Sequence, residues 1–191
     1  PEPAHDIAPW QRILATGTHH LLYLLLIVNP VVGWFATSAY GAPLVVVVAL
    51  KTIVADLGTD RSVVALAGAL SWVGTGAGGI AMGWLADRIG LRPVVALGVV
   101  MTAAGLGLSA WGGIGSLYIG HGLLMGFLGV GAIYAPLLIN VSRWFDRRRG
   151  LAVAMVAAGQ NLAGAIWPPI VRHVTDGHGW RTTFLAYGIF T

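Results

Sequence analysis

The stretch SWVGTGAGGIAMGWLADRIGLRP, from Ser71 to Pro93, decides between two very different folds. Its glycines Gly74, Gly76 and Gly79 match the pattern GxGxxG, which holds a dinucleotide when it follows a β-strand and precedes an acid by about 20 residues. Here the glycines lie inside one apolar run, where GxxxG pairs let two helices approach closely in lipid. We therefore interpret the stretch as a membrane helix that ends in a charged turn.

The composition of the whole chain supports the membrane interpretation. Of the 191 residues, 57% are hydrophobic and only 9% are charged, and the mean hydropathy is +0.79. Soluble domains carry about 25% charged residues. Apolar runs of about 20 residues, long enough to cross a hydrocarbon core of about 30 Å, recur between short polar clusters. The sequence predicts an all-α, polytopic transmembrane helix bundle, for which the lipid bilayer is the first partner.

The apolar runs predict four spans, at 63–85, 94–111, 115–140 and 150–172. One or two further crossings precede residue 57, because the apolar region 13–50 is too long for one straight crossing. A last apolar run begins at Thr182 and reaches Thr191 after about half the length that a crossing needs. We therefore expect a truncated last helix.

The positive charges predict the orientation of the bundle. Six of the eleven Lys and Arg residues fall in two short clusters, Arg88 and Arg92, then Arg143, Arg147, Arg148 and Arg149. The positive-inside rule places both clusters in the cytoplasm, in loops at 86–93 and 142–149. The loops at 112–115 and 174–180 then face outward. Because the cations mark helix ends and form no stripe with interleaved aromatic residues, nucleic acid is not an expected partner.

The end of the opening stretch, GWLADRIGLR, carries a family resemblance in Gly83, Leu85, Ala86, Asp87, Arg88, Gly90 and Arg92. Gly83 leaves room for a neighbouring helix, Gly90 suits a tight turn, and Asp87 can meet a helix N-terminus or an arginine. The residues resemble the G-x-L-A-D-R-x-G-R-R/K motif between the second and third helices of the major facilitator superfamily. The resemblance implies that Asp87 bridges two halves at the cytoplasmic side and holds the outward-open state. Leu91 replaces a basic residue of that motif, which implies a weaker lock.

A second segment, SLYIGHGLLMGFLGVGAIYAPLLINVSRWFDRRRGLAVAMVAAGQNLAGAIWPPIV followed by GWRTTF, narrows the resemblance. It is similar to helices four and five of bacterial monocarboxylate and oxalate/formate porters, and the two resemblances together cover 51–191. They imply one six-helix half of a transporter that holds a small organic anion between two halves and works by alternating access. The missing C-terminal half, or a second copy, would then be needed for transport. The implied location is the bacterial inner membrane.

Polar residues inside the apolar runs are candidates for a substrate cavity, because such residues face a bundle interior or a cavity. They are His121, Tyr134, Asn140, Gln160, Asn161 and Trp167. His121 could couple protons to transport or could be a hydrogen-bonded helix contact. Gln160 and Asn161 point about 100° apart on a helix, so we expect only one to line a cavity. Tyr134 and Trp167 could equally be packing aromatics.

The N-terminal region carries a different resemblance. Residues 9–43 resemble the third-helix region of small bacterial di-haem b-type membrane cytochromes, in which His19 would help to bind haem. The other haem-binding helices of that family are absent, so we expect no cofactor and no metal. We interpret 1–12 as a polar segment and 13–50 as a cytochrome-like remnant, joined to the transporter half 51–191. Two alternatives stay open: a haem b electron-transfer protein and a non-transporting fragment.

An enzyme is not expected. The chain has no cysteine, which excludes thiolate chemistry and disulfides. It also has no P-loop, no HExxH pair and no serine nucleophile motif.

Overall fold

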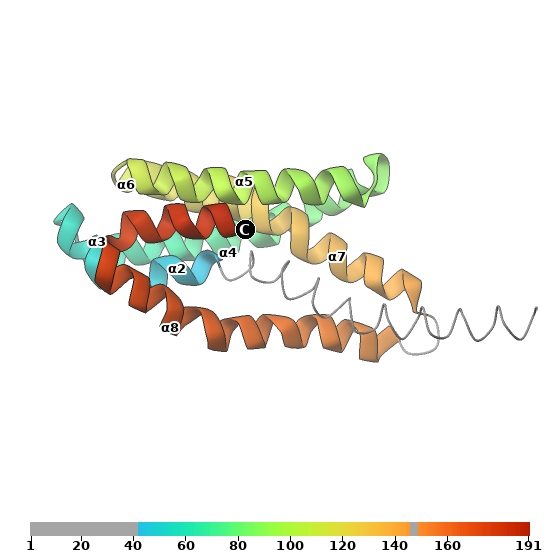
Figure 1. Cartoon of the computed structure of the whole chain (residues 1–191). Helices are drawn as coiled ribbons and strands as arrows, with labels where there is room; N and C mark the ends of the chain where they lie inside the picture. The colour runs from blue at the N-terminus through green and yellow to red at the C-terminus, as the bar shows by residue number, and fades with distance from the viewer. Residues whose placement is uncertain (1–41, 146–148) are drawn as a thin grey trace, which may run out of the picture.

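The computed structural model describes residues 42–145 and 149–191, which form a bundle of helices (Figure 1). Four helical runs are long and apolar enough to cross a membrane. They are α4 (Arg61–Ile89), α5 (Leu91–Trp111), the run Ile114–Arg143 and α8 (Arg149–Phe190). The all-α architecture is thereby confirmed, and each of the four predicted spans falls within one of these helical runs.

Two short helices precede these spans and are separated only by Ala49. They are α2 (Ala42–Val48) and α3 (Leu50–Leu57). The amide of Ala49 donates to the Val45 carbonyl at 2.9 Å, and the amide of Ile53 donates to the Ala49 carbonyl at 3.0 Å. Ala49 (φ −82°, ψ 3°) is therefore hydrogen-bonded to both helices, although its own backbone is not helical. Segment 1–12 and most of 13–50 lie outside the described residues.

Two turns are much shorter than predicted. The loop expected at 86–93 is reduced to Gly90 (φ 91°, ψ 161°), which separates α4 from α5. The loop expected at 174–180 is reduced to Gly179 (φ 81°, ψ 162°), the one non-helical residue inside α8. Glycine reaches positive φ at little cost, so a single residue redirects the chain. The breaks at 112–113 and 145 agree with the two other predicted loops.

The third span is the central element of the bundle. It consists of α6 (Ile114–Tyr118), a π-helix η1 (Ile119–Val130) and α7 (Gly131–Trp144), and η1 packs between α4 and α5. A Cβ atom on Gly74 would collide with the backbone of Gly122, and one on Gly78 with the backbone of Phe127. The GxxxG pair of the opening stretch is therefore a helix contact, as predicted. The π-helix was not predicted, because an apolar pattern reports burial and not the hydrogen-bond register.

The core runs along the faces that the helices share. Its fully buried side chains include Ile53, Leu106, Leu117 and Phe184. Large apolar side chains also cover the outside of the bundle, where lipid can solvate them. The last part of α8 (red) lies beside α5, and the C-terminus is midway along the bundle (Figure 1).

Candidate functional site

The predicted gating acid, Asp87, has an arginine partner. Arg143 donates from Nη2 to Asp87 Oδ1 at 3.3 Å and thereby joins the last turn of α4 to the end of α7. Arg143 belongs to the second basic cluster and Asp87 to the loop predicted at 86–93, so the fold brings the two predicted cytoplasmic loops together. The side chains are 66% and 64% exposed. An exposed pair stabilises by only about 0.2–1 kcal/mol, so this contact can be exchanged for another.

A small pocket of about 220 Å³ lies beside this ion pair. The α4–α5 turn contributes Asp87 and Gly90, and α7 contributes Pro136, Asn140 and Arg143. Asn140, a predicted cavity residue, is therefore placed at this end of the bundle and not at its middle. The pocket combines charge with small residues, which suits an incoming helix end or a polar side chain.

The other predicted basic residues lie apart from the ion pair. The guanidinium of Arg88 lies 3.9 Å from the ring centroid of Trp84, and Arg92 is exposed in the first turn of α5. Within 42–145 and 149–191, neither forms an ion pair with an acid. Arg149 is exposed at the start of α8, whereas Arg147 and Arg148 lie outside the described residues.

An open groove of about 630 Å³ runs along α4 and α7. Gly76, Gly79 and Gly83 contribute backbone to it, and Trp72, Trp84 and Tyr134 are among the aromatic residues that line it. Nothing lies within 4 Å of a Cβ atom built on Gly76 or Gly83. Gly83 does open space for a neighbour, as its motif predicts, and the described part of this chain leaves that space empty. Tyr134 is placed in this groove.

His121 belongs to the core of the bundle. It has no exposed surface, its Nδ1 lies 2.9 Å from Ser109 Oγ, and its ring is 5.5 Å from that of Phe184. The Ser109 hydroxyl donates to the Gly105 carbonyl at 2.8 Å, so Ser109 Oγ accepts from Nδ1–H. Nε2 then carries a lone pair with no partner among the described residues. His121 lines neither the groove nor the pocket described above, and its position favours the helix-contact alternative.

The remaining predicted cavity residues lie on α8. Trp167 packs edge-on against Tyr187 and Phe190, with centroid distances of 5.0 and 4.9 Å, as a packing aromatic does. Gln160 and Asn161 are within α8, but their side chains are outside what the structure describes. The haem candidate His19 also lies outside the described residues.

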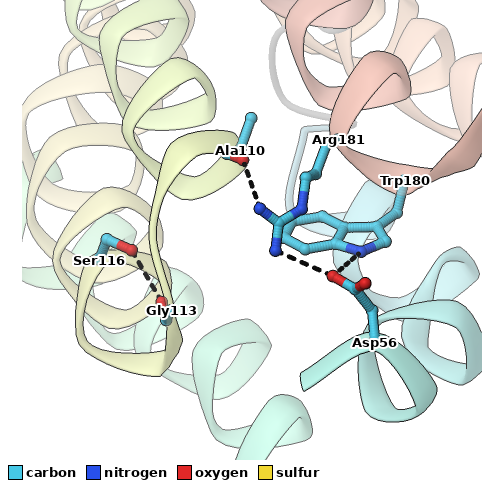
Figure 2. A network of polar contacts seen from close by, with 6 residues as sticks. All are labelled: Asp56, Ala110, Gly113, Ser116, Trp180 and Arg181. Atoms are coloured by element: carbon cyan, nitrogen blue, oxygen red, sulfur yellow. Dashed lines mark hydrogen bonds and ion pairs between the residues drawn. The ribbon is translucent and has the colours of Figure 1, made fainter. Parts of the chain in front are cut away.

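Sequence reasoning missed a polar cluster at the opposite end of the bundle (Figure 2). Arg181 Nη2 and Trp180 Nε1 both donate to Asp56 Oδ2, at 2.9 and 3.2 Å. Arg181 Nη1 also reaches the Ala110 carbonyl at 3.5 Å, near the end of α5. Asp56 lies beyond the four spans, and the hydrogen bonds from Arg181 and then Trp180 lower the pKa of its carboxyl. The available signal was an acid and a cation beside predicted helix ends on the same side of the membrane.

Comparison with known proteins identifies the family. Residues 21–191 match the family model described as Major Facilitator Superfamily. The chain belongs to the major facilitator superfamily. The match includes most of the segment 9–43 that resembles a cytochrome. This superfamily member is therefore a multi-pass membrane protein of a transporter family.

Several curated relatives of the chain are named as monocarboxylate transporters. Monocarboxylate transporter 11 of Mus musculus is 40% identical over 108 residues, which cover 56% of this chain and 24% of that protein. Monocarboxylate transporter 3 of Mus musculus is 31% identical over 151 residues, 78% of this chain and 30% of that protein. The MFS-type transporter pynF of Aspergillus niger is 30% identical over 195 residues, 100% of this chain and 41% of that protein. The chain thus spans well under half the length of these relatives.

Proposed function

We propose that this chain is one half of a secondary transporter that carries a small organic anion, such as a monocarboxylate, by alternating access. The observation that carries the proposal is the 31% identity to a monocarboxylate transporter over 78% of the chain. Membership of the superfamily supports transport of a small solute, and the relatives' names support the carboxylate class. The proposed site lies between this half and a second one.

The second half of the transporter, or a second copy of this chain, is proposed to pack along the α4–α7 groove. The glycine backbone at Gly76 and Gly83 supports this, because small residues let membrane helices approach closely. The short coverage of the relatives, at 24–41% of their length, supports it independently. Asp87 would then exchange its contact with Arg143 for one with the second half, and would so bias the outward-open state.

We propose that the Asp87 end of the bundle faces the cytoplasm of a plasma membrane. The four basic residues Arg88, Arg92, Arg143 and Arg149 support this orientation, since all lie near that end. A cysteine at Gly115 should react with an impermeant thiol reagent added outside, and one at Arg92 should be protected. The opposite pattern would reverse the orientation. The relatives named above are animal and fungal proteins, which lends no support to the bacterial membrane expected from the sequence.

Transport is tested with the full-length protein in liposomes. We expect uptake of labelled lactate, formate or oxalate above that of empty liposomes, and competition by unlabelled carboxylate. Uptake measured with and without an imposed pH gradient distinguishes proton symport from anion exchange. If none of the three anions is transported, the proposed substrate class is contradicted.

A visible spectrum of the same preparation tests the haem alternative. We expect no haem band. A stoichiometric Soret band that shifts on dithionite reduction and disappears in His19→Ala would favour electron transfer instead of transport.

A further inference from the structure

The polar cluster of Asp56, Ala110, Trp180 and Arg181 joins three helix ends that are distant in the sequence (Figure 2). We propose that this cluster, the Asp56 clasp, stays closed throughout the transport cycle and fixes α3, α5 and the last part of α8 into one rigid body. This inference rests on the proposed alternating-access function. It assigns Asp56 and Arg181 as positioning residues of the half, distinct from the gating role proposed for Asp87.

The geometry of the clasp supports a closed joint. One carboxylate oxygen, Asp56 Oδ2, accepts from two donors, Arg181 Nη2 and Trp180 Nε1. The Arg181 guanidinium lies 4.7 Å from the Trp180 ring centroid, so its orientation is also restricted. Its second amino group reaches the Ala110 carbonyl in the last turn of α5, where helix carbonyls lack an intrahelical partner. The same guanidinium therefore binds two helices.

Two backbone turns restrict the positions of the clasp residues. Gly179, with φ 81°, redirects α8 directly before Trp180, so both donors stand at the start of the returning segment. On the other side, α3 ends at Gly58 (φ 58°), two residues after Asp56. Neither glycine conformation is readily adopted by another residue type. The positions of acid and donors are therefore set by two sharp turns and not by long loops.

The buried Trp180 donor distinguishes the clasp from the Asp87–Arg143 pair, because the Asp56 and Arg181 side chains are themselves 48% and 45% exposed. The Trp180 side chain is only 4% exposed and packs edge-on against the fully buried Phe184, with centroids 5.3 Å apart. Opening the clasp would leave the Trp180 N–H without its acceptor at the edge of the core, which is unfavourable. The Asp87–Arg143 contact is longer, at 3.3 Å, and two-thirds exposed on both sides. The exposed pair is suited to exchange, whereas the clasp is suited to stay closed.

A covalent replacement of the clasp tests this inference. The chain contains no cysteine, so Asp56→Cys with Arg181→Cys provides a single reactive pair. A short bis-methanethiosulfonate, whose disulfide links can be reduced again, should join the two in the full-length transporter in liposomes. Carboxylate uptake should then equal or exceed that of the reduced double variant. The two single variants, treated with the same reagent, are matched controls for modification at one position.

Three outcomes would overturn the clasp. Loss of uptake on crosslinking, with recovery on reduction, would show that the joint must open during transport. Failure to crosslink, although each single cysteine reacts, would show that the two ends are not held together.

The third outcome does not depend on transport. In thermal unfolding of the detergent-solubilised protein, Asp56→Asn and Arg181→Gln should not be additive, and the double variant should unfold close to the weaker single variant. Full additivity would contradict the proposal of the clasp. If the effects are not additive but the wild-type protein transports no carboxylate, the clasp is supported as a structural contact and the proposed substrate class is contradicted.

Discussion

Asp87 and Arg143 are 56 positions apart in the sequence, yet the carboxylate of one accepts a hydrogen bond from the guanidinium of the other at 3.3 Å. The contact lies within one half of the proposed transporter, between α4 and α7. A residue whose family motif implies a contact with the second half therefore has a competing partner in its own half. We propose that the balance between the two partners contributes to gating.

Substitution Asp87→Asn tests this balance in the full-length transporter. It keeps the shape of the side chain and removes its charge, so both competing contacts weaken. Because the observed pair is about two-thirds exposed, its loss should shift the inward-open to outward-open ratio by no more than about fivefold. Accessibility of a single cysteine in the cavity, together with uptake rate, measures the shift. Arg143→Gln is the matched control for the contact within this half. If both variants behave like wild type, Asp87 is only a charged loop residue with no role in gating.

The groove predicts opposite effects for two glycines of the same helix. Gly83→Leu should leave the fold of this half intact, because nothing lies within 4 Å of its Cβ position, but should impair association with the second half and uptake. Gly78→Leu should destabilise this half by about 1–3 kcal/mol or more, because a Cβ atom there meets the Phe127 backbone. Detergent stability and uptake separate the two effects. Normal uptake by Gly83→Leu would show that the groove faces lipid.

His121 tests whether a buried histidine takes part in proton coupling. We expect His121→Leu to retain the pH dependence of uptake, because the ring is fully buried against Phe184 and its Nδ1 is engaged by Ser109. The variant loses that hydrogen bond and gains no unpaired nitrogen. Uptake over a range of external pH is the measurement, with Ser109→Ala as the control for the lost contact. A folded variant that transports without proton dependence would restore the coupling role.

The Asp56 clasp predicts a specific pH dependence of stability. The pKa of Asp56 is lowered in the folded protein by Arg181 and Trp180. A carboxyl with a depressed folded pKa contributes stability above its unfolded pKa of about 3.9, and this contribution is lost as pH falls through the folded pKa. The melting temperature of wild type should therefore exceed that of Asp56→Asn by a constant amount between about pH 5 and pH 8, and the difference should shrink only in more acidic solution.

Arg172→Gln is the matched control for the clasp prediction. Arg172 pairs with Asp176 at 3.9 Å on the same helix, and both side chains are at least two-thirds exposed. Its loss should leave the melting temperature unchanged at every pH. An equal effect of Arg172→Gln and Asp56→Asn would mean that general surface charge, and not the clasp, sets the stability.

The sequence by itself determined the membrane architecture and the places where helices turn. The hydrocarbon thickness fixes the length of an apolar run, so the spans followed from composition along the chain. The GxxxG pair at Gly74 and Gly78 and the turn at Gly90 also followed, because each depends on local backbone properties. The lengths of the turns did not follow, since a positive-φ glycine is indistinguishable in sequence from one inside a helix.

Only the tertiary structure decided which polar groups meet. Asp56 and Arg181 are 125 positions apart, and their contact depends on the relative height and rotation of α3 and α8. The same rotation places His121 in the core and Tyr134 in the groove, although both are polar residues of one apolar run. Side-chain direction in a helix changes by about 100° per residue, so a small difference in packing or a π-helical segment changes what each residue faces. The hydropathy of a run can be read from its sequence, whereas the direction in which each side chain points depends on how the helices pack in the bundle.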